Sequence, residues 1–278
     1  MSKRRGERPP VPETLPAPVV DAHTHLDACG AKTPRDVREV LDRANAAGVD
    51  RVVTVADDLD SARWAAEAAT WDERVFAAVA LHPTRTSDFG DDVRAELTRL
   101  AGLPRVVAIG ETGLDYYWDY APRDAQHEAF RWHVDLAKRV RKPLMIHDRD
   151  AHDDVLAVLD SEGAPDEVVF HCFSGDLAFA RACVERGFVL SFAGTATFRN
   201  AHALREAARW VPGDHLLVET DAPFLTPHPF RGRPNEPYCA AYTLRDIATL
   251  REEDPADLAT MITRTAERIF GLRDVAES

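Results

Sequence analysis

The sequence lacks the features of secreted, disulfide-linked and membrane proteins. Its four cysteines are Cys29, Cys172, Cys183 and Cys239. They form no C-x-x-C pair and suggest no disulfide framework, which fits a reducing cytoplasm. No stretch approaches the roughly 20 apolar residues that a membrane-spanning helix needs, and no apolar run follows the basic start of the chain. We therefore expect a cytoplasmic protein without a secretory signal and without membrane contact.

The sequence also lacks a positive net charge. It holds 34 Lys and Arg against 47 Asp and Glu, which gives a formal charge of −13. Such a charge argues against a protein that coats long nucleic acids by electrostatic attraction, but it allows an enzyme that binds one or two phosphates locally. Four of the first eight residues are Lys or Arg, so we predict a flexible basic tail over residues 1–16. Residues 17–278 contain no linker cluster and are expected to form one domain.

Short apolar or β-branched runs alternate with helical stretches along this domain. The predicted strands are 19–22, 51–56, 75–81, 106–110, 143–146, 167–170, 188–192 and 216–218. The predicted helices are 34–47, 61–70, 91–100, 121–140, 153–159, 178–185, 201–210, 238–250 and 255–270. Strict alternation implies a parallel sheet, and eight repeats in roughly 250 residues predict an α/β fold, the (β/α)8 TIM barrel.

The alternative architecture is an open, doubly wound sheet. That fold normally carries a glycine-rich turn after its first strand. Here His23-Thr24-His25 occupies that position, and no G-x-G-x-x-G motif lies nearby. We therefore expect the barrel.

Six imidazole or carboxylate side chains fall where predicted strands end. They are His23, His25, Glu111, His147, His171 and Asp221. The strand ends of a barrel lie on one rim, the face on which active sites are built. Each residue has a structural alternative, such as a turn cap for Asp221 or an arginine partner for Glu111, but their coincidence on one rim favours metal binding. Imidazoles with carboxylates suit Zn or Mn, and Mg more loosely, and six ligands predict two metals that share Glu111.

The stretches around these residues resemble the TatD family of metal-dependent deoxyribonucleases, over about residues 20–270. The matching motifs are DAHTHL (21–26), GETGLDYY (110–117), IHDRDA (146–151), HCFSG (171–175), ETDAP (219–223) and RGRPNEP (231–237). The resemblance implies one metal held by His23, His25, Glu111 and Asp221, and a second held by Glu111, His147 and His171. The chain departs from the family at Asp148, where most relatives would have Ser or Thr. We expect Asp148 to add negative charge near the substrate.

Other residues on the same rim are predicted to bind a phosphodiester substrate. The candidates for contacts with phosphate or base are His82, Tyr116, Arg149, Arg231 and Asn235. A guanidinium fork matches phosphate oxygens, and Tyr116, with Tyr117 and Trp118, can stack a terminal base. Asp221 is the residue expected to take a proton from the attacking water, and Glu111 completes the catalytic pair.

These expectations favour a 3′→5′ exodeoxyribonuclease that uses two divalent ions, Mg, Mn or Zn, on single-stranded or frayed DNA ends. Part of this activity is implied by the family resemblance. A metal-dependent ester hydrolase, such as a D-aminoacyl-tRNA deacylase, would need the same metal pair and a phosphate-rich partner such as tRNA. A non-catalytic metal protein is disfavoured because a structural site closes its coordination shell. We expect a monomer or a weak oligomer.

Overall fold

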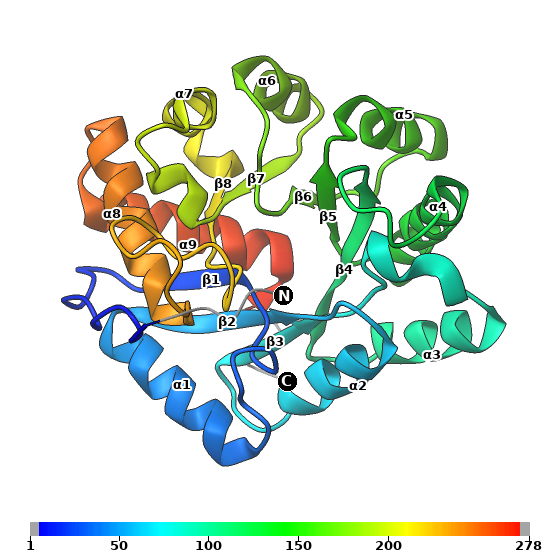
Figure 1. Cartoon of the computed structure of the whole chain (residues 1–278), viewed down its shortest axis with the longest axis horizontal. Coiled ribbons are helices and arrows are strands. Elements are labelled where there is room, and N and C mark those ends of the chain that lie inside the picture. The colour runs from blue at the N-terminus through cyan, green and yellow to red at the C-terminus, as the bar shows by residue number, and fades with distance from the viewer. Residues whose placement is uncertain (1–5, 273–278) are drawn as a thin grey trace.

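Eight strands form a nearly closed parallel barrel in the computed structural model, which describes residues 6–272 (Figure 1). The strands are β1 (Val19–Thr24), β2 (Val49–Val55), β3 (Val75–Ala78), β4 (Val106–Asp115), β5 (Leu144–Arg149), β6 (Val168–Phe170), β7 (Val189–Phe192) and β8 (Leu216–Val218). Neighbours in the sheet follow the chain order, and each paired ladder is parallel. The (β/α)8 barrel predicted from the sequence is confirmed.

Helices surround the strands and connect them (Figure 1). The α-helices are α1 (Pro34–Ala46), α2 (Leu59–Ala68), α3 (Asp91–Ala101), α4 (Arg123–Val140), α5 (His152–Glu162), α6 (Leu177–Glu185), α7 (His202–Trp210), α8 (Ala240–Arg251) and α9 (Pro255–Phe270). The 3-10 helices are η1 (Pro83–Asp88), η2 (Gly194–Thr197), η3 (Gly213–His215) and η4 (Pro237–Cys239). None of the helices in residues 6–272 is long and apolar enough to cross a membrane.

Local sequence signals set the helix boundaries. Helix α1 begins at Pro34 because the Thr33 hydroxyl accepts a hydrogen bond from the Asp36 amide, and the Asp36 carboxylate accepts one from the Thr33 amide. This capping box satisfies amide groups that the first turn of a helix leaves free. Helix α9 ends at Phe270, and the next residue, Gly271, adopts the left-handed conformation that favours glycine after a helix.

The longest strand, β4, extends beyond its predicted end. The sequence predicts an end at Gly110, but pairing with β5 continues from Thr112 to Asp115. All ten residues of β4 are buried, because helices cover the outside of a parallel barrel and side chains fill its interior. Glu111 therefore lies within β4 and not after it, and β5 likewise runs through His147.

Backbone contacts draw β1 and β8 together. The His25 amide donates to the Ala222 carbonyl at 2.7 Å, and the Asp221 amide donates to the His23 carbonyl at 2.9 Å. A parallel bridge joins Thr24 to Ala222. The residues that close the barrel are thus the candidate ligands and their immediate neighbours.

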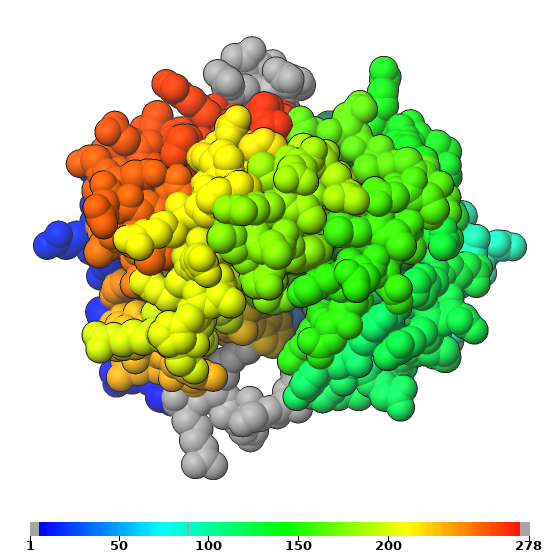
Figure 2. Space-filling model, turned by 90° about the horizontal axis from the view of Figure 1, so that it is seen from above, coloured from blue at the N-terminus to red at the C-terminus, as the bar shows by residue number. Residues whose placement is uncertain are grey.

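The described part of the predicted basic tail, residues 6–16, lies against α8 (blue beside orange in Figures 1 and 2). The Tyr238 hydroxyl donates to the Pro9 carbonyl at 2.6 Å, and the Arg245 guanidinium donates to the Glu13 carbonyl at 2.6 Å. Leu15 is buried, so this segment adds to the barrel core. Residues 1–5 of the predicted tail and residues 273–278 of the predicted domain lie outside the described residues.

Candidate metal centre

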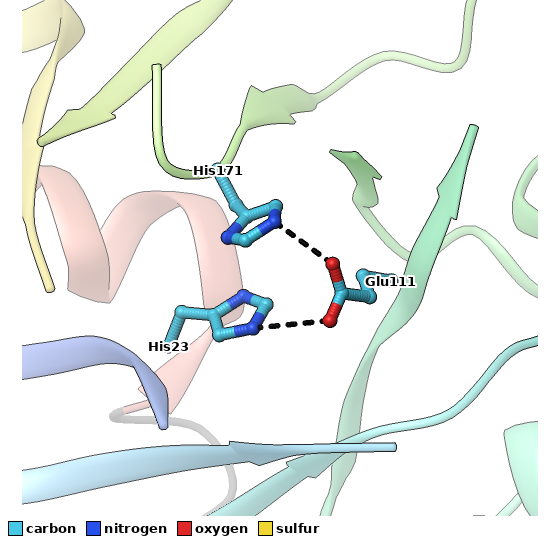
Figure 3. Close-up of side chains that lie close together, drawn as sticks. All are labelled: His23, Glu111 and His171. Atoms are coloured by element: carbon cyan, nitrogen blue, oxygen red, sulfur yellow. Dashed lines mark ion pairs between the residues drawn. The ribbon is translucent and has the colours of Figure 1, made fainter. Parts of the chain in front are cut away.

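The six predicted ligands converge at the carboxyl ends of the strands. His23 lies in β1 and His25 just after it, His147 lies in β5, His171 follows β6, and Asp221 follows β8. Their convergence follows from the topology, because parallel strands in a closed barrel all end on one rim. The imidazole rings of His23 and His171 stack with centroids 3.9 Å apart, and both face Glu111 of β4 (Figure 3).

Glu111 occupies the centre of the cluster, and its two carboxylate oxygens face different partners. Oε1 lies 3.5 Å from Nε2 of His23 and 3.5 Å from Nε2 of His25. Oε2 lies 2.8 Å from Nε2 of His171 and 3.1 Å from Nδ1 of His147. Figure 3 shows one contact of each kind. The carboxylate therefore joins two groups of donor atoms.

The first donor group consists of His23, His25, Asp221 and Oε1 of Glu111. Its histidine nitrogens lie 3.2 Å apart, and Oδ1 of Asp221 lies 3.3 Å from His25 and 3.8 Å from His23. Four ligand atoms arranged tetrahedrally about 2.0–2.1 Å from an ion lie about 3.3–3.4 Å from one another. The donor spacing therefore fits a divalent metal, and imidazoles and carboxylates are side chains that suit one chemically.

The second donor group consists of His147, His171 and Oε2 of Glu111. Nδ1 of His147 lies 3.5 Å from Nε2 of His171, so all three donor atoms lie within the span that one ion can bridge. Nε2 of His82 adds a fourth donor atom, 3.3 Å from His147 and 3.9 Å from Glu111. The sequence predicts His82 as a substrate contact and not as a metal ligand. Its Nδ1 also lies 2.6 Å from the Thr84 hydroxyl and accepts a hydrogen bond from the Thr84 amide, so His82 caps the start of η1.

Two glycines allow β4 to approach β5 closely enough to form this cluster. Gly113 has φ +143°, and a Cβ atom there would lie 2.1 Å from the carbonyl oxygen of His147. A Cβ atom at Gly110 would lie 2.4 Å from Cβ of Met145. Side chains at either position would push the strands apart. The glycines of the GETGLDYY motif thus set the distance between Glu111 and His147.

Three further hydrogen-bond acceptors orient the candidate ligand histidines by contacting the ring nitrogen that does not face Glu111. Oδ2 of Asp115 lies 2.9 Å from Nε2 of His147, and Oε1 of Glu219 lies 3.2 Å from Nδ1 of His171. The Val55 carbonyl lies 2.9 Å from Nδ1 of His25. An acceptor on one ring nitrogen fixes the proton there and leaves the other nitrogen free to bind a metal.

Sequence reasoning missed these orienting residues. Asp115 and Glu219 are both part of motifs that were singled out, GETGLDYY and ETDAP, but nothing in their spacing assigned them a partner. It also missed Asp57, whose Oδ1 lies 3.6 Å from Nδ1 of His25. The available signal for Asp57 was its position two residues after β2, on the same rim as the ligands.

Burial and the neighbouring charges shift the pKa values of the clustered side chains in different directions. Burial, with the nearby His171, lowers the pKa of His23 to about 4. Burial opposes the charged form of His25, but Asp221, Asp57 and Glu111 outweigh it and raise the pKa of His25 to about 10. Burial likewise opposes ionisation of Glu111, but His171 and the other histidines hold its pKa well below the usual range. Glu111 is therefore ionised, and the cluster is organised around its negative charge.

A family model described as TatD related DNase matches residues 20–271 of the chain. The chain belongs to the TatD family. The "Uncharacterized metal-dependent hydrolase TatD" of Mycobacterium tuberculosis is 59% identical over 259 residues, which cover 91% of this chain and 98% of that protein. The "3'-5' ssDNA/RNA exonuclease TatD" of Citrobacter rodentium is 36% identical, with 86% and 93% covered.

A solved TatD structure agrees with these sequence matches. YJJV, a TatD homolog from Escherichia coli K12, has a TM-score of 0.84 and 29% sequence identity, with 91% of this chain and 98% of that chain covered. The family predicted from the motifs is therefore confirmed. The metal-binding donor set of this chain fits a family of metal-dependent hydrolases.

The predicted substrate residues of this TatD protein have different surroundings. Arg149 is exposed at the rim, with its guanidinium carbon 3.8 Å from the centroid of the Tyr117 ring. Arg231 is exposed in the loop after β8, 4.6 Å from the centroid of Phe198. Tyr116 is partly buried, and its hydroxyl lies 2.8 Å from Nε2 of His127. The guanidinium groups of Arg149 and Arg231 are thus exposed, whereas the Tyr116 hydroxyl already has a partner.

Asn235 does not reach the mouth of the barrel. It is 2% exposed, and its side-chain amide donates to the carbonyls of Thr220 and Phe224 at 2.9 and 2.5 Å. Its side-chain oxygen accepts a hydrogen bond from the Glu236 amide. Because all of these groups are satisfied within the loop, Asn235 holds the loop that follows Asp221 and presents no free donor to a phosphate.

Asp148 also lies away from the mouth. Successive residues of a strand point to opposite sides, so Asp148 points away from the side that His147 and Arg149 share. Its Oδ2 lies 2.7 Å from Nδ1 of His152 in α5, and its side chain is 5% exposed. The expectation that Asp148 adds negative charge near the substrate is therefore wrong.

Proposed function

We propose that this protein is a metal-dependent phosphodiesterase, a 3′→5′ exonuclease that acts on single-stranded or frayed DNA ends in the cytoplasm. The observation that carries the proposal is the position of Glu111, whose two oxygens face separate groups of donor atoms. A carboxylate shared in this way is typical of two-metal hydrolases. The name of the Citrobacter rodentium relative, a 3'-5' ssDNA/RNA exonuclease, supports the choice of substrate.

We propose that the clustered residues hold two ions. His23, His25, Glu111 and Asp221 would hold the first, and Glu111, His147 and His171 the second. Divalent Mg, Mn or Zn in these positions would supply Lewis-acid activation of water and charge stabilisation for phosphodiester displacement.

Asp221 is the residue best placed to accept a proton from the attacking water. Its side chain is 13% exposed, against 4% for Glu111, so it lies at the open side of the first donor group. Its Oδ1 is also within 3.3 Å of Nε2 of His25, which keeps the carboxylate turned towards the cluster. A carboxylate in this position serves as a general base within reach of water.

Arg149 supplies positive charge at the rim. It is exposed and lies two residues after His147 on the same strand, so both side chains point to the same side of β5. Its planar guanidinium can bind phosphate oxygens in a fork. We propose that Arg149 binds a phosphate of the DNA end, with Arg231 adding charge from the loop after β8.

The Glu111→Ala variant tests the proposal. We expect it to lose nuclease activity on single-stranded DNA and to bind less metal, while its circular dichroism spectrum stays unchanged. Asp148→Asn is the matched control, because Asp148 is adjacent to His147 in sequence but contacts His152, so it should retain both properties. Full nuclease activity in Glu111→Ala would refute the two-metal mechanism.

A substrate screen with the wild-type protein tests the nuclease assignment itself. Single-stranded DNA, duplex DNA, RNA and tRNA charged with a D-amino acid would be supplied together with Mg, Mn or Zn. We expect nucleotides to be released from the single-stranded DNA. Release of the amino acid without release of nucleotides would replace the nuclease by an ester hydrolase.

A further inference from the structure

An exposed aromatic cluster lies beside the candidate metal centre. Tyr117, Trp118 and Tyr120, in the loop between β4 and α4, are 55%, 43% and 67% exposed. They are three of the five large hydrophobic side chains that stand out as exposed in residues 6–272. Large aromatic rings are normally buried, so such a concentration in one loop indicates a binding surface.

The rings are arranged against one another and against a cation. The Trp118 and Tyr120 rings stack with centroids 5.3 Å apart at an interplanar angle of 12°. The Tyr117 ring meets Trp118 edge-on at 4.8 Å. The Arg149 guanidinium lies 3.8 Å from the Tyr117 centroid and 5.7 Å from the Trp118 centroid. The surface therefore combines π faces with one positive charge.

A single carboxylate ties this loop to a candidate metal ligand. Oδ1 of Asp115 accepts hydrogen bonds from the amides of Tyr117 and Trp118 at 3.0 and 2.9 Å. Oδ2 of the same residue lies 2.9 Å from Nε2 of His147. The side chain that orients His147 therefore also fixes the backbone that carries the rings.

The loop that carries the rings begins where β4 ends, just beyond the candidate metal centre. Asp115 pairs with Arg149 in the ladder, and Gly113 pairs with His147. The loop thus starts two residues beyond the level of His147, about 6–7 Å along the strand. A nucleotide whose phosphate lies at the metal centre would extend its base towards this loop.

We propose that Tyr117, Trp118 and Tyr120, together with Arg149, form a stacking platform for an unpaired base at the end of a single-stranded nucleic acid. The proposal rests on the proposed function and names how that site selects its substrate. Stacking on aromatic rings accepts any base, because every base has a π face. A base inside a duplex is covered on both faces, so the platform selects single-stranded or frayed ends. Tyr116 is not part of it, since its side chain is partly buried against the core and its hydroxyl contacts His127.

The test compares oligonucleotides that differ by one base. A single-stranded oligodeoxynucleotide is matched with one that has an abasic residue at the terminal or next-to-terminal position. We expect the wild-type KM to rise roughly 5- to 150-fold for the abasic oligonucleotide, the range that corresponds to loss of one stacked base. Trp118→Ala and Tyr117→Ala should show a raised KM for the normal oligonucleotide, little change in kcat, and no further rise for the abasic one.

Matched variants separate stacking from general damage. Trp118→Phe keeps a ring and should restore most of the base preference. Trp210→Ala removes a ring that is 36% exposed on α7, where Arg181 lies 5.3 Å from its centroid, and it should behave as the wild type. Equal KM values for normal and abasic oligonucleotides with the wild-type protein, or wild-type KM values in Trp118→Ala and Tyr117→Ala, would overturn the platform while leaving the nuclease assignment intact.

Failure of the nuclease assignment gives a different pattern. If the wild-type protein cleaves none of the oligonucleotides, the proposed function fails, and fluorescence anisotropy of a 5′-labelled oligonucleotide reports the platform alone. Binding that weakens with the abasic oligonucleotide and with Trp118→Ala would still support the platform. Binding that is absent, or indifferent to both changes, would overturn it.

Discussion

Glu219 is predicted to tune metal binding without touching the metal. It is fully buried, and its Oε1 accepts a hydrogen bond from the Cys172 amide at 2.9 Å and lies 3.2 Å from Nδ1 of His171. This acceptor keeps a proton on Nδ1 and leaves Nε2 of His171 facing Glu111 at 2.8 Å. The substitution Glu219→Gln preserves shape and one acceptor oxygen but removes the negative charge.

The magnitude follows from the change in hydrogen-bond type. A hydrogen bond to a charged group contributes about 1.5–3 kcal/mol and a neutral one about 0.5–1.5. The difference, about 1–1.5 kcal/mol, corresponds to a metal affinity lower by about tenfold, the lower end of the range for residues that support metal ligands. The fold should survive, because Oε2 of Glu219 has no hydrogen-bond partner among residues 6–272 to lose.

The assay is a metal titration against a competing chelator, with metal content measured by mass spectrometry. We expect Glu219→Gln to lose occupancy of the ion proposed at His171 before that of the other proposed ion. Asp148→Asn serves as the control, because its carboxylate contacts His152 and no candidate ligand.

A double-mutant cycle decides whether the effect passes through His171. Adding Glu219→Gln to a His171→Asn background should cause no further loss of metal affinity, since coupled neighbours are not additive. A metal affinity within twofold of the wild type in Glu219→Gln, or a full tenfold loss in the His171→Asn background, would refute the reasoning.

Two further outcomes are expected. Because the raised pKa of His25, about 10, leaves its imidazole protonated near neutral pH, metal binding should release protons and tighten as pH rises. Calorimetry in buffers of different ionisation enthalpy measures this release, and a heat independent of the buffer would contradict it. Asn235→Ala should lower the free energy of unfolding by about 1–3 kcal/mol, because the carbonyls of Thr220 and Phe224 lose their donor. Denaturant unfolding measures the loss, and KM for DNA should stay unchanged.

The barrel could be predicted from the sequence because its signal is local and repeated. Each strand is a short apolar run followed by a helix, and the ring order follows from topology. The ends of β4 and β5 could not be predicted in the same way. Their last residues, such as Asp115 and Arg149, are polar and read as loop, although the ladder between the two strands continues through both.

The convergence of the candidate ligands could be predicted for a similar reason, whereas the residues that orient them could not. Position at the end of a predicted strand places a side chain near the rim, which is enough to bring His147 and Glu111 together although both lie within the strands of the structure. It does not tell which carboxylate faces which ring nitrogen. Asp115 meets His147 across 32 residues, and Glu219 meets His171 across 48. Those pairings depend on the register of neighbouring strands, which a single sequence does not contain.

The net charge of −13 is compatible with binding of the end of a nucleic-acid strand. The ionised Glu111 lies inside the cluster among histidines, where divalent ions would offset its charge. Near the mouth, the positive charge of Arg149 lies against the rings of Tyr117 and Trp118. Stacking needs no net attraction between protein and nucleic acid. An acidic protein can therefore bind a strand end through rings and one guanidinium, while its remaining negative surface repels the length of a duplex.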